Sequence, residues 1–86
     1  FTTLHTPGHT PGGFGFYFPE EKILFSGDTL FCGSVGRTDF PGGSMSEIIK
    51  SIKEKYFTLP EDTSVYTGHG EDTTIGFEKI NNPFVA

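Results

Sequence analysis

Three residues of metal-binding type, His9, Asp28 and His69, share one local sequence context. Each of them lies beside glycine at the end of a strand-like run, and such positions can gather on one edge of a sheet. Imidazole nitrogen and carboxylate oxygen are ligands that suit zinc or iron. A single histidine in such a place is more often a turn, capping or core residue. The residue types alone therefore leave a metal site and ordinary turn chemistry both open.

The strands that would position these residues are predicted from β-favouring and alternating side chains. Phe1–Thr6 reads as a short strand, and Phe14–Phe18 places a phenylalanine at every second position, so its rings share one face. After a turn at Pro19–Lys22, the apolar run Ile23–Ser26 predicts a second strand antiparallel to Phe14–Phe18. Ser64–Thr67 is a further predicted core strand. We therefore expect a hairpin with one phenylalanine-lined face.

Two helices are predicted from capping residues and apolar spacing. Ser44 begins the first, and Glu47 three residues later completes a capping box. A second, shorter helix is expected from Asp72 or Thr73 to about Ile80. The apolar stripe of the first helix consists of Met45, Ile48, Ile49, Ile52 and Tyr56.

The segment from Asp28 to Gly43 loses periodicity and collects glycine and proline. We expect a long, shaped loop here, and such loops in compact domains tend to be functional. The order of strands, helix, strand and helix predicts an α+β fold, a mostly antiparallel sheet with helices on one face.

Length and composition limit the class of protein. With 86 residues the chain forms one domain at most, and its ten phenylalanines predict a core dominated by aromatic area. The net charge of −5 and the absence of a lysine stripe argue against a nucleic-acid partner. The apolar runs are too short for a membrane span, so no membrane partner is expected.

A single cysteine, Cys32, cannot form an internal disulfide, which suits a reducing compartment and predicts a cytoplasmic protein. The chain enters a strand at Phe1 without a leader, so we expect a fragment or a processed product. A sheet with helices on one face only would leave its phenylalanine-lined face uncovered, which predicts self-association.

The segments around the three candidate residues resemble the last three metal motifs of the metallo-β-lactamase superfamily. Additional stretches narrow the resemblance to the compact, glyoxalase II-like enzymes, also called hydroxyacylglutathione hydrolases. The metal motifs are Thr6–Gly12, Ser26–Phe31 and Gly68–Gly70, and the additional stretches are Gly36–Phe40, Leu59–Pro60, Thr73–Glu78 and Asn82–Phe84.

The resemblance implies that residues 1–86 are the C-terminal half of an αββα sandwich. By position, His9 would complete the first metal site, Asp28 would bridge the two metals as the catalytic carboxylate, and His69 would complete the second site. The implied metals are two zinc ions per complete site, with iron or manganese as alternatives. The remaining family ligands come from an upstream His-x-His-x-Asp-His motif, which residues 1–86 do not contain.

The implied reaction is hydrolysis of a small-molecule glutathione thioester. In the family site, water bound to the metal becomes a hydroxide near neutral pH and attacks the thioester carbonyl. Arg37 is the candidate for binding a glutathione carboxylate, because guanidinium pairs with carboxylate bidentately. An ion pair between Arg37 and Asp39 is the structural alternative.

Other interpretations remain open. The segment Gly36–Phe40 also resembles the mononuclear-iron dioxygenases that use glutathione persulfide, which gives an alternative enzymatic function. A catalytically inactive half-domain is a third. His5, close to His9, is expected to be structural or to support a ligand, and Cys32 is expected to be a buried, inert thiol.

Overall fold

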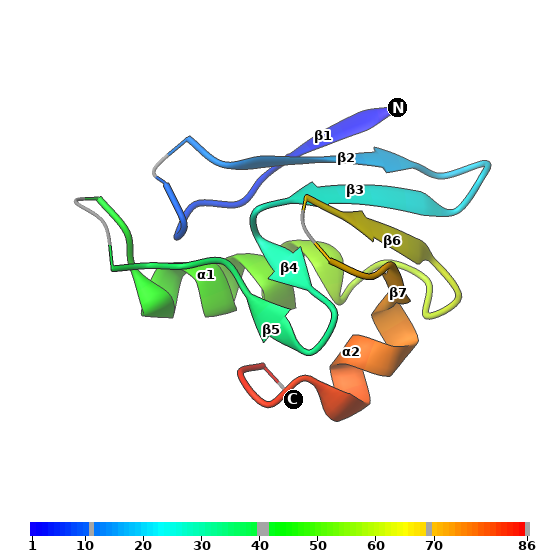
Figure 1. The fold of residues 1–86 in the computed structure, drawn as a ribbon. Coiled ribbons are helices and arrows are strands. Elements are labelled where there is room, and N and C mark those ends of the chain that lie inside the picture. The colour runs from blue at the N-terminus through cyan, green and yellow to red at the C-terminus, as the bar shows by residue number, and fades with distance from the viewer. Residues whose placement is uncertain (11, 40–41, 69, 86) are drawn as a thin grey trace.

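A computed structural model describes residues 1–10, 12–39, 42–68 and 70–85. It contains a five-stranded sheet in the order β1-β2-β3-β6-β7 and a separate two-stranded hairpin of β4 and β5 (Figure 1). The elements are β1 (Thr2–His5), β2 (Phe14–Phe18), β3 (Ile23–Gly27), β4 (Leu30–Phe31), β5 (Ser34–Val35), α1 (Met45–Ser51), the π-helical turn η1 (Ile52–Tyr56), β6 (Ser64–Thr67), β7 (Thr73–Thr74) and α2 (Ile75–Asn81).

Strand directions in the sheet decide which loops meet. β1 and β3 are both antiparallel to β2, so they run in the same direction. β6 lies parallel to β3, with Leu24 opposite Val65, after a crossover through α1. The carboxyl ends of β1, β3 and β6 therefore lie at the same edge of the sheet. This mostly antiparallel α+β architecture confirms the predicted fold class.

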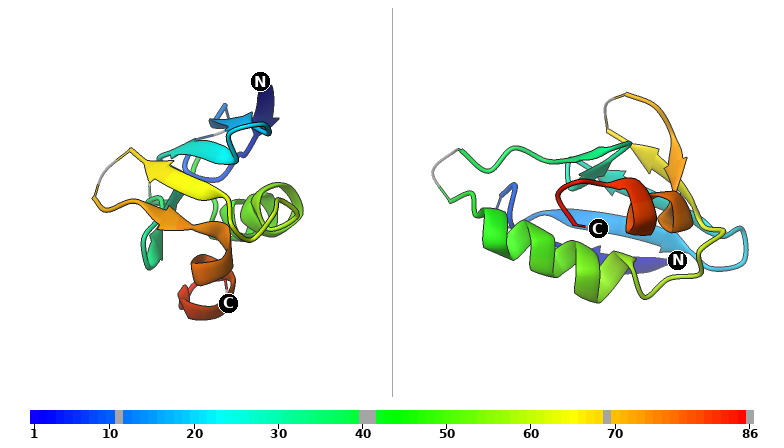
Figure 2. Two further views of the ribbon diagram at one scale, coloured as in Figure 1. Left: turned by 90° about the vertical axis from the view of Figure 1, so that its right-hand side faces the viewer. Right: turned by 90° about the horizontal axis from the view of Figure 1, so that it is seen from below.

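Both helices lie on one face of the sheet, below it in Figure 1 and in front of it in the right-hand view of Figure 2. Alternation along the strands turns one set of side chains toward the helices. Leu24 of β3 and Val65 of β6 are fully buried, as are Ile48, Ile52 and Tyr56 of the helical layer. The predicted arrangement of helices on one face is therefore confirmed.

The opposite face of the sheet carries aromatic rings. Phe16 and Phe25 are directly opposite each other on β2 and β3, with 42% and 44% of their surface exposed. We call this set of residues the aromatic face. Its members are Phe1, Phe14, Phe16, Phe18, Phe25 and Tyr66.

The expectation of an aromatic core is wrong. Of the aromatic side chains that the structure describes, only Tyr56 belongs to the buried core. Strand alternation directs the phenylalanines of β2 and β3 to the other face. The remaining core residues are aliphatic: Leu24, Leu30, Val35, Ile48, Ile52, Val65, Ile75 and Val85.

The first helix begins as predicted. The side chain of Ser44 accepts a hydrogen bond from the backbone N–H of Glu47, and the helix continues through the π-helical turn η1. Met45, however, is 42% exposed, so this first residue of the predicted stripe faces away from the core. The second helix is capped by Thr74 rather than by Asp72 or Thr73.

The expected long loop from Asp28 to Gly43 contains the β4–β5 hairpin. Each strand has only two residues, too few for an alternating pattern to reveal it in the sequence. Within the described parts of the chain, no helix is long and apolar enough to cross a bilayer.

Candidate functional site

His9 and Asp28 lie side by side at the edge where β1 and β3 end. His9 belongs to the loop after β1, and Asp28 directly follows β3. His9 Nε2 lies 3.7 Å from Asp28 Oδ2. The parallel direction of β1 and β3 thus brings together two of the three residues that the sequence singled out.

The backbone carbonyl of Arg37 orients the ring of His9. His9 Nδ1 lies 2.7 Å from this oxygen, and because a carbonyl oxygen only accepts, Nδ1 carries the proton. In the neutral imidazole the lone pair then belongs to Nε2, the nitrogen that faces Asp28. Metal-binding histidines are typically held in this way, with the second ring nitrogen donating to a carbonyl or carboxylate.

The chemistry of these donor atoms fits a divalent cation. The 3.7 Å between Nε2 and Oδ2 exceeds a hydrogen-bond distance, and both atoms are electron donors. A cation between them would attract both, and nitrogen and carboxylate ligands suit zinc, iron and manganese. The His9 and Asp28 side chains are 22% and 47% exposed, so the space between them is open to a ligand.

Two glycines let the backbone approach Asp28 closely. A Cβ on Gly36 would collide with the backbone oxygen of Asp28 and come 3.2 Å from the Cβ of His9. A Cβ on Gly68 would come 2.8 Å from Asp28 Oδ1, and the Gly68 N–H donates to the Gly27 carbonyl at 2.8 Å. The absence of side chains at Gly36 and Gly68 is therefore required by the geometry around Asp28.

The third predicted ligand, His69, lies outside the described residues. Its neighbour Gly68 lies close to the Asp28 carboxylate. Among the residues that the structure describes, no group of three or more histidines, cysteines or acidic residues is arranged to hold a metal ion. The metal-binding role of His69 therefore stays a prediction.

The side chain of Arg37 pairs with Asp39. Nε and Nη2 donate to the two carboxylate oxygens, each at 3.1 Å. This pairing raises the pKa of Arg37 and lowers that of Asp39. Both side chains are 69% exposed, so the pair is open to solvent and a substrate carboxylate could compete with Asp39. The ion pair that the sequence offered as the alternative is present, and substrate binding stays a prediction.

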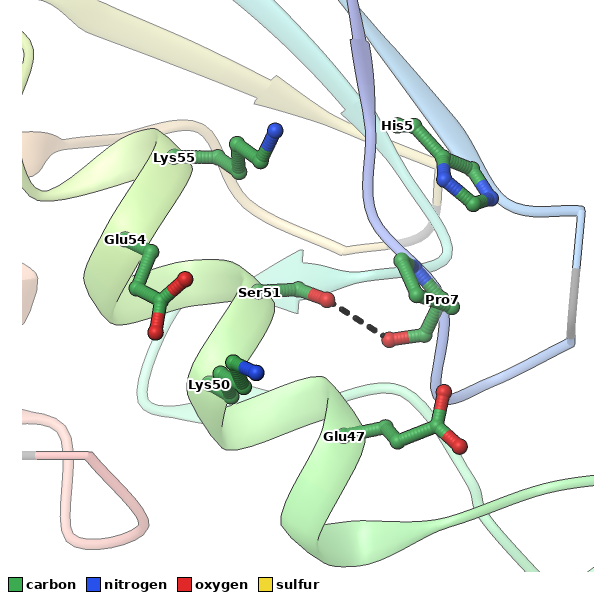
Figure 3. Close-up of a pocket in the computed structure, with 7 residues that line it drawn as sticks. All are labelled: His5, Pro7, Glu47, Lys50, Ser51, Glu54 and Lys55. Atoms are coloured by element: carbon green, nitrogen blue, oxygen red, sulfur yellow. Dashed lines mark hydrogen bonds between the residues drawn. The ribbon is translucent and has the colours of Figure 1, made fainter.

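Among the described residues, His5 does not join His9 and Asp28 in a metal-binding cluster. Its ring packs against Phe14 with a centroid distance of 5.4 Å. It also lines a cavity of about 500 Å³ between β1 and the first helix (Figure 3). In this cavity the Ser51 hydroxyl donates to the Pro7 carbonyl at 2.8 Å, which fastens α1 to the loop that carries His9.

Cys32 lies in the turn between β4 and β5. It is partly buried and free, and it lines a smaller cavity of about 330 Å³ together with Thr73 and Phe77. The expectation of a buried thiol is thus only partly met, because Cys32 is partly buried and lines this cavity.

A buried cluster of hydroxyls links the two loops of the site, and the sequence did not reveal it. Thr6, three residues before His9, lies 3.1 Å from the hydroxyl of Thr29, the residue after Asp28. The Tyr56 hydroxyl is 3.4 Å from Thr6 Oγ1. Threonines beside both metal motifs were the available signal, but only the fold shows that they meet.

Comparisons with known proteins found a matching family and similar sequences. The family model described as the Metallo-beta-lactamase superfamily matches residues 1–69. The hydroxyacylglutathione hydrolase GloC of Haemophilus influenzae is 52% identical over 85 residues, which are 99% of this chain and 40% of that protein. The chain thus spans about two fifths of the length of this relative.

Three solved structures share the fold closely. The BLEG-1 B3 metallo-beta-lactamase superposes with a TM-score of 0.95 at 50% identity, over 99% of this chain and 41% of that one. TTHA1623 in a di-iron-bound form gives a TM-score of 0.93 at 50% identity, over 98% of this chain and 42% of that chain. ETHE1 from Myxococcus xanthus gives a TM-score of 0.92 at 39% identity, over 99% of this chain and 39% of that chain.

Proposed function

Because the chain belongs to the metallo-beta-lactamase superfamily, we propose that it supplies part of the active site of a metal-dependent hydrolase for hydroxyacylglutathione-type thioesters. The observation that carries the proposal is the pairing of His9 Nε2 with Asp28 Oδ2, with His9 Nδ1 fixed by the Arg37 carbonyl. The 52% identity to the GloC hydrolase supports the choice of substrate class.

In this proposal His9, Asp28 and His69 would hold the metals, with Asp28 as the catalytic carboxylate that serves both. When bound, the metals supply a nucleophile from water at neutral pH and polarise the thioester carbonyl. The chain's own contribution is orientation. The Arg37 carbonyl holds the imidazole in one tautomer. Gly36 and Gly68 leave the room that the Asp28 backbone oxygen and the Asp28 carboxylate, respectively, occupy.

We assign Arg37 to substrate binding. Its guanidinium is exposed and already engages a carboxylate, that of Asp39, and bidentate pairing of this kind suits a glutathione carboxylate. Zinc is the proposed metal, and the di-iron form of TTHA1623 supports iron as the alternative. The lone Cys32 supports a reducing, cytoplasmic location.

We further propose that residues 1–86 form the C-terminal half of a longer catalytic domain. The GloC relative is about two and a half times as long as the matched region. The missing half would supply the His-x-His-x-Asp-His ligands and cover the aromatic face with a second sheet. The isolated 86-residue chain would then be catalytically inactive, because most of the ligands are outside it.

An oxygen-consuming function is the second candidate. The likeness to ETHE1 from Myxococcus xanthus, 39% identical with a TM-score of 0.92, fits a glutathione persulfide dioxygenase equally. That reaction would use one iron per chain, whereas the hydrolase uses two metals.

One experiment separates the two activities. The full polypeptide that contains this segment is assayed in parallel for loss of S-lactoylglutathione and for oxygen uptake with glutathione persulfide, and its metal content is measured. Thioester loss with two metals per chain is the expected result. Oxygen uptake with one iron per chain and no thioester loss would overturn the hydrolase proposal.

Two pairs of variants test the site within the same assay. His9→Ala should abolish thioester loss, whereas Lys53→Ala, a change at an exposed side chain of η1 away from the site, should leave it unchanged. Asp28→Asn should likewise abolish thioester loss. Asp62→Asn is its control and should leave the activity unchanged, because Asp62 pairs with Lys22 on the surface. Equal activities within either pair would argue against the assigned ligands.

A further inference from the structure

Glu78 is a carboxylate that α2 buries completely. Its Oε1 accepts from the Gly33 backbone N–H at 3.0 Å and from Asn82 Nδ2 at 2.9 Å. Its Oε2 accepts from the Thr73 hydroxyl at 2.6 Å. Burying a carboxylate is unfavourable unless hydrogen bonds compensate its charge. The three neutral donors from Gly33, Asn82 and Thr73 together engage both oxygens of Glu78.

Asn82, one helical turn after Glu78, holds the same turn of chain. It is fully buried, and its Nδ2 also donates to the Ser34 carbonyl at 3.0 Å. Its Oδ1 accepts from the Phe84 N–H at 3.0 Å, which fixes the amide orientation. Glu78 and Asn82 therefore fasten the Gly33 N–H of the β4–β5 turn and the Ser34 carbonyl of β5 to α2 and the residue that ends it.

The other end of the β4–β5 hairpin forms one wall of the His9–Asp28 site. The Gly36 N–H donates to the Thr29 carbonyl at 3.0 Å, and Gly36 packs against Asp28 and His9. The next residue, Arg37, presents the carbonyl that orients His9. Since the strands have only two residues each, a displacement of the turn would reach this carbonyl directly.

We propose that Glu78, supported by Asn82, is a positioning residue of the His9–Asp28 site that acts through the β4–β5 hairpin. The hairpin is clamped at its turn by α2 and at its base by Thr29, and this double attachment sets the Arg37 carbonyl at the right place for His9 Nδ1. The inference deepens the proposed function and rests on it for the role of the site, although the effect on His9 is independent of catalysis.

The test compares three variants of the full polypeptide. Glu78→Ala removes the hydrogen bonds that hold the β4–β5 turn to α2. Glu78→Gln keeps most of them, because the glutamine oxygen can accept from the Gly33 N–H and its amide can donate to the Thr73 hydroxyl. Ile52→Ala is the matched control, because it opens a cavity in the buried helical layer without removing a hydrogen bond. Melting temperatures show whether Glu78→Ala and Ile52→Ala are destabilised to a similar extent.

Two measurements report on the site itself. The first is the nitrogen chemical shifts of the His9 ring in the metal-free protein, recorded above the ordinary pKa of an imidazole. The second is zinc affinity by competition with a chromophoric chelator. Wild type, Glu78→Gln and Ile52→Ala should show the Nδ1-protonated tautomer and similar affinities. Glu78→Ala should show mixed tautomers and bind zinc about 10- to 100-fold more weakly.

The outcomes are distinct from those of the activity assay. An unchanged His9 tautomer and unchanged zinc affinity in Glu78→Ala would overturn the inference, even if thioester hydrolysis is confirmed. Mixed tautomers in Glu78→Ala would sustain it, even if hydrolysis is refuted. Should Glu78→Ala not fold, Thr73→Val removes a single hydrogen bond from Glu78, and a partial change in the His9 tautomer is then expected, with an unchanged tautomer overturning the inference.

Discussion

At the scale of single residues, a backbone carbonyl holds the imidazole of His9. Its Nδ1 donates to the Arg37 carbonyl, and its Cβ lies close to Gly36. The orientation of the ring therefore depends on two neighbouring residues of one loop segment. A substitution that moves this segment should disturb the His9–Asp28 pair even when both side chains are intact.

Gly36→Ala tests this dependence. The added methyl group would collide with the Asp28 backbone oxygen, so we expect a loss of about 1–3 kcal/mol in the free energy of unfolding. Zinc affinity should fall as well, because the Arg37 carbonyl is displaced. Gly12→Ala is the control, since a Cβ there meets no atom within 4 Å. Urea denaturation and chelator competition check both variants, and equal behaviour would contradict the account.

Tyr56 makes stability depend on alkaline pH. Burial raises the pKa of its phenol, and hydrogen bonds from Thr6 and Thr29 only partly oppose this. In the unfolded chain a tyrosine ionises near pH 10, at its ordinary pKa. As the pH rises above about 10, the unfolded state loses this proton before the folded state does, so stability falls.

Tyr56→Phe should remove this loss of stability at alkaline pH. At neutral pH the variant should be less stable by about 0.5–1.5 kcal/mol, because it lacks the hydroxyl of the Thr6–Thr29 cluster. Above about pH 10 its stability should decline less steeply than that of the wild type. Denaturant unfolding from neutral to alkaline pH measures both curves. Parallel curves above pH 10 would show that Tyr56 does not carry the effect.

At the scale of elements, the site depends on the shared direction of β1, β3 and β6 and on the attachment of α1. The loop that carries His9 is tied to the first helix twice, by the bond from Ser51 to the Pro7 carbonyl and by the Ser44 N–H, which donates to the Gly8 carbonyl at 2.7 Å. The start of the helix is therefore also a support for the loop.

Ser44→Ala should weaken this support. It removes the side-chain acceptor for the Glu47 N–H, which typically costs about 1 kcal/mol. Ser44→Asp retains an acceptor and adds a favourable charge at the helix start, so it should recover the stability. Thermal unfolding of the two variants checks the prediction, and an equal loss in both would contradict a capping role.

Much of this arrangement can be predicted from the sequence, for identifiable reasons. Alternation at Phe14–Phe18 and capping at Ser44 are local signals, and both predicted elements are confirmed. The β4–β5 hairpin was missed because its strands are too short for a periodic pattern. Contacts such as that of Glu78 with Gly33 join residues far apart in the chain, and no local signal encodes them.

At the scale of the whole molecule, the sheet has one covered and one uncovered face. The helices and the aliphatic core cover one side, whereas Phe16, Phe25 and their neighbours leave the aromatic face open. Uncovered apolar patches of this kind mark interaction sites. The chain also spans only about two fifths of the GloC relative, which is consistent with another part of a longer polypeptide lying on this face.

The isolated 86-residue chain should therefore self-associate through the aromatic face. Light scattering is expected to show a mass that rises with concentration, and Phe16→Glu with Phe25→Glu should reduce it. Ile80→Glu is the control, because Ile80 is 78% exposed on α2, away from this face. A stable monomer at all concentrations would contradict the prediction.

The central claim is that His9 and Asp28 meet around a common cation. It is tested most directly by a crystal structure of the metal-loaded full polypeptide, with data collected at the absorption edge of the bound metal. The account predicts an anomalous peak at about 2.0–2.2 Å from both His9 Nε2 and an Asp28 carboxylate oxygen, with His9 Nδ1 still bonded to the Arg37 carbonyl. A peak elsewhere, or a metal bound through Nδ1, would contradict it.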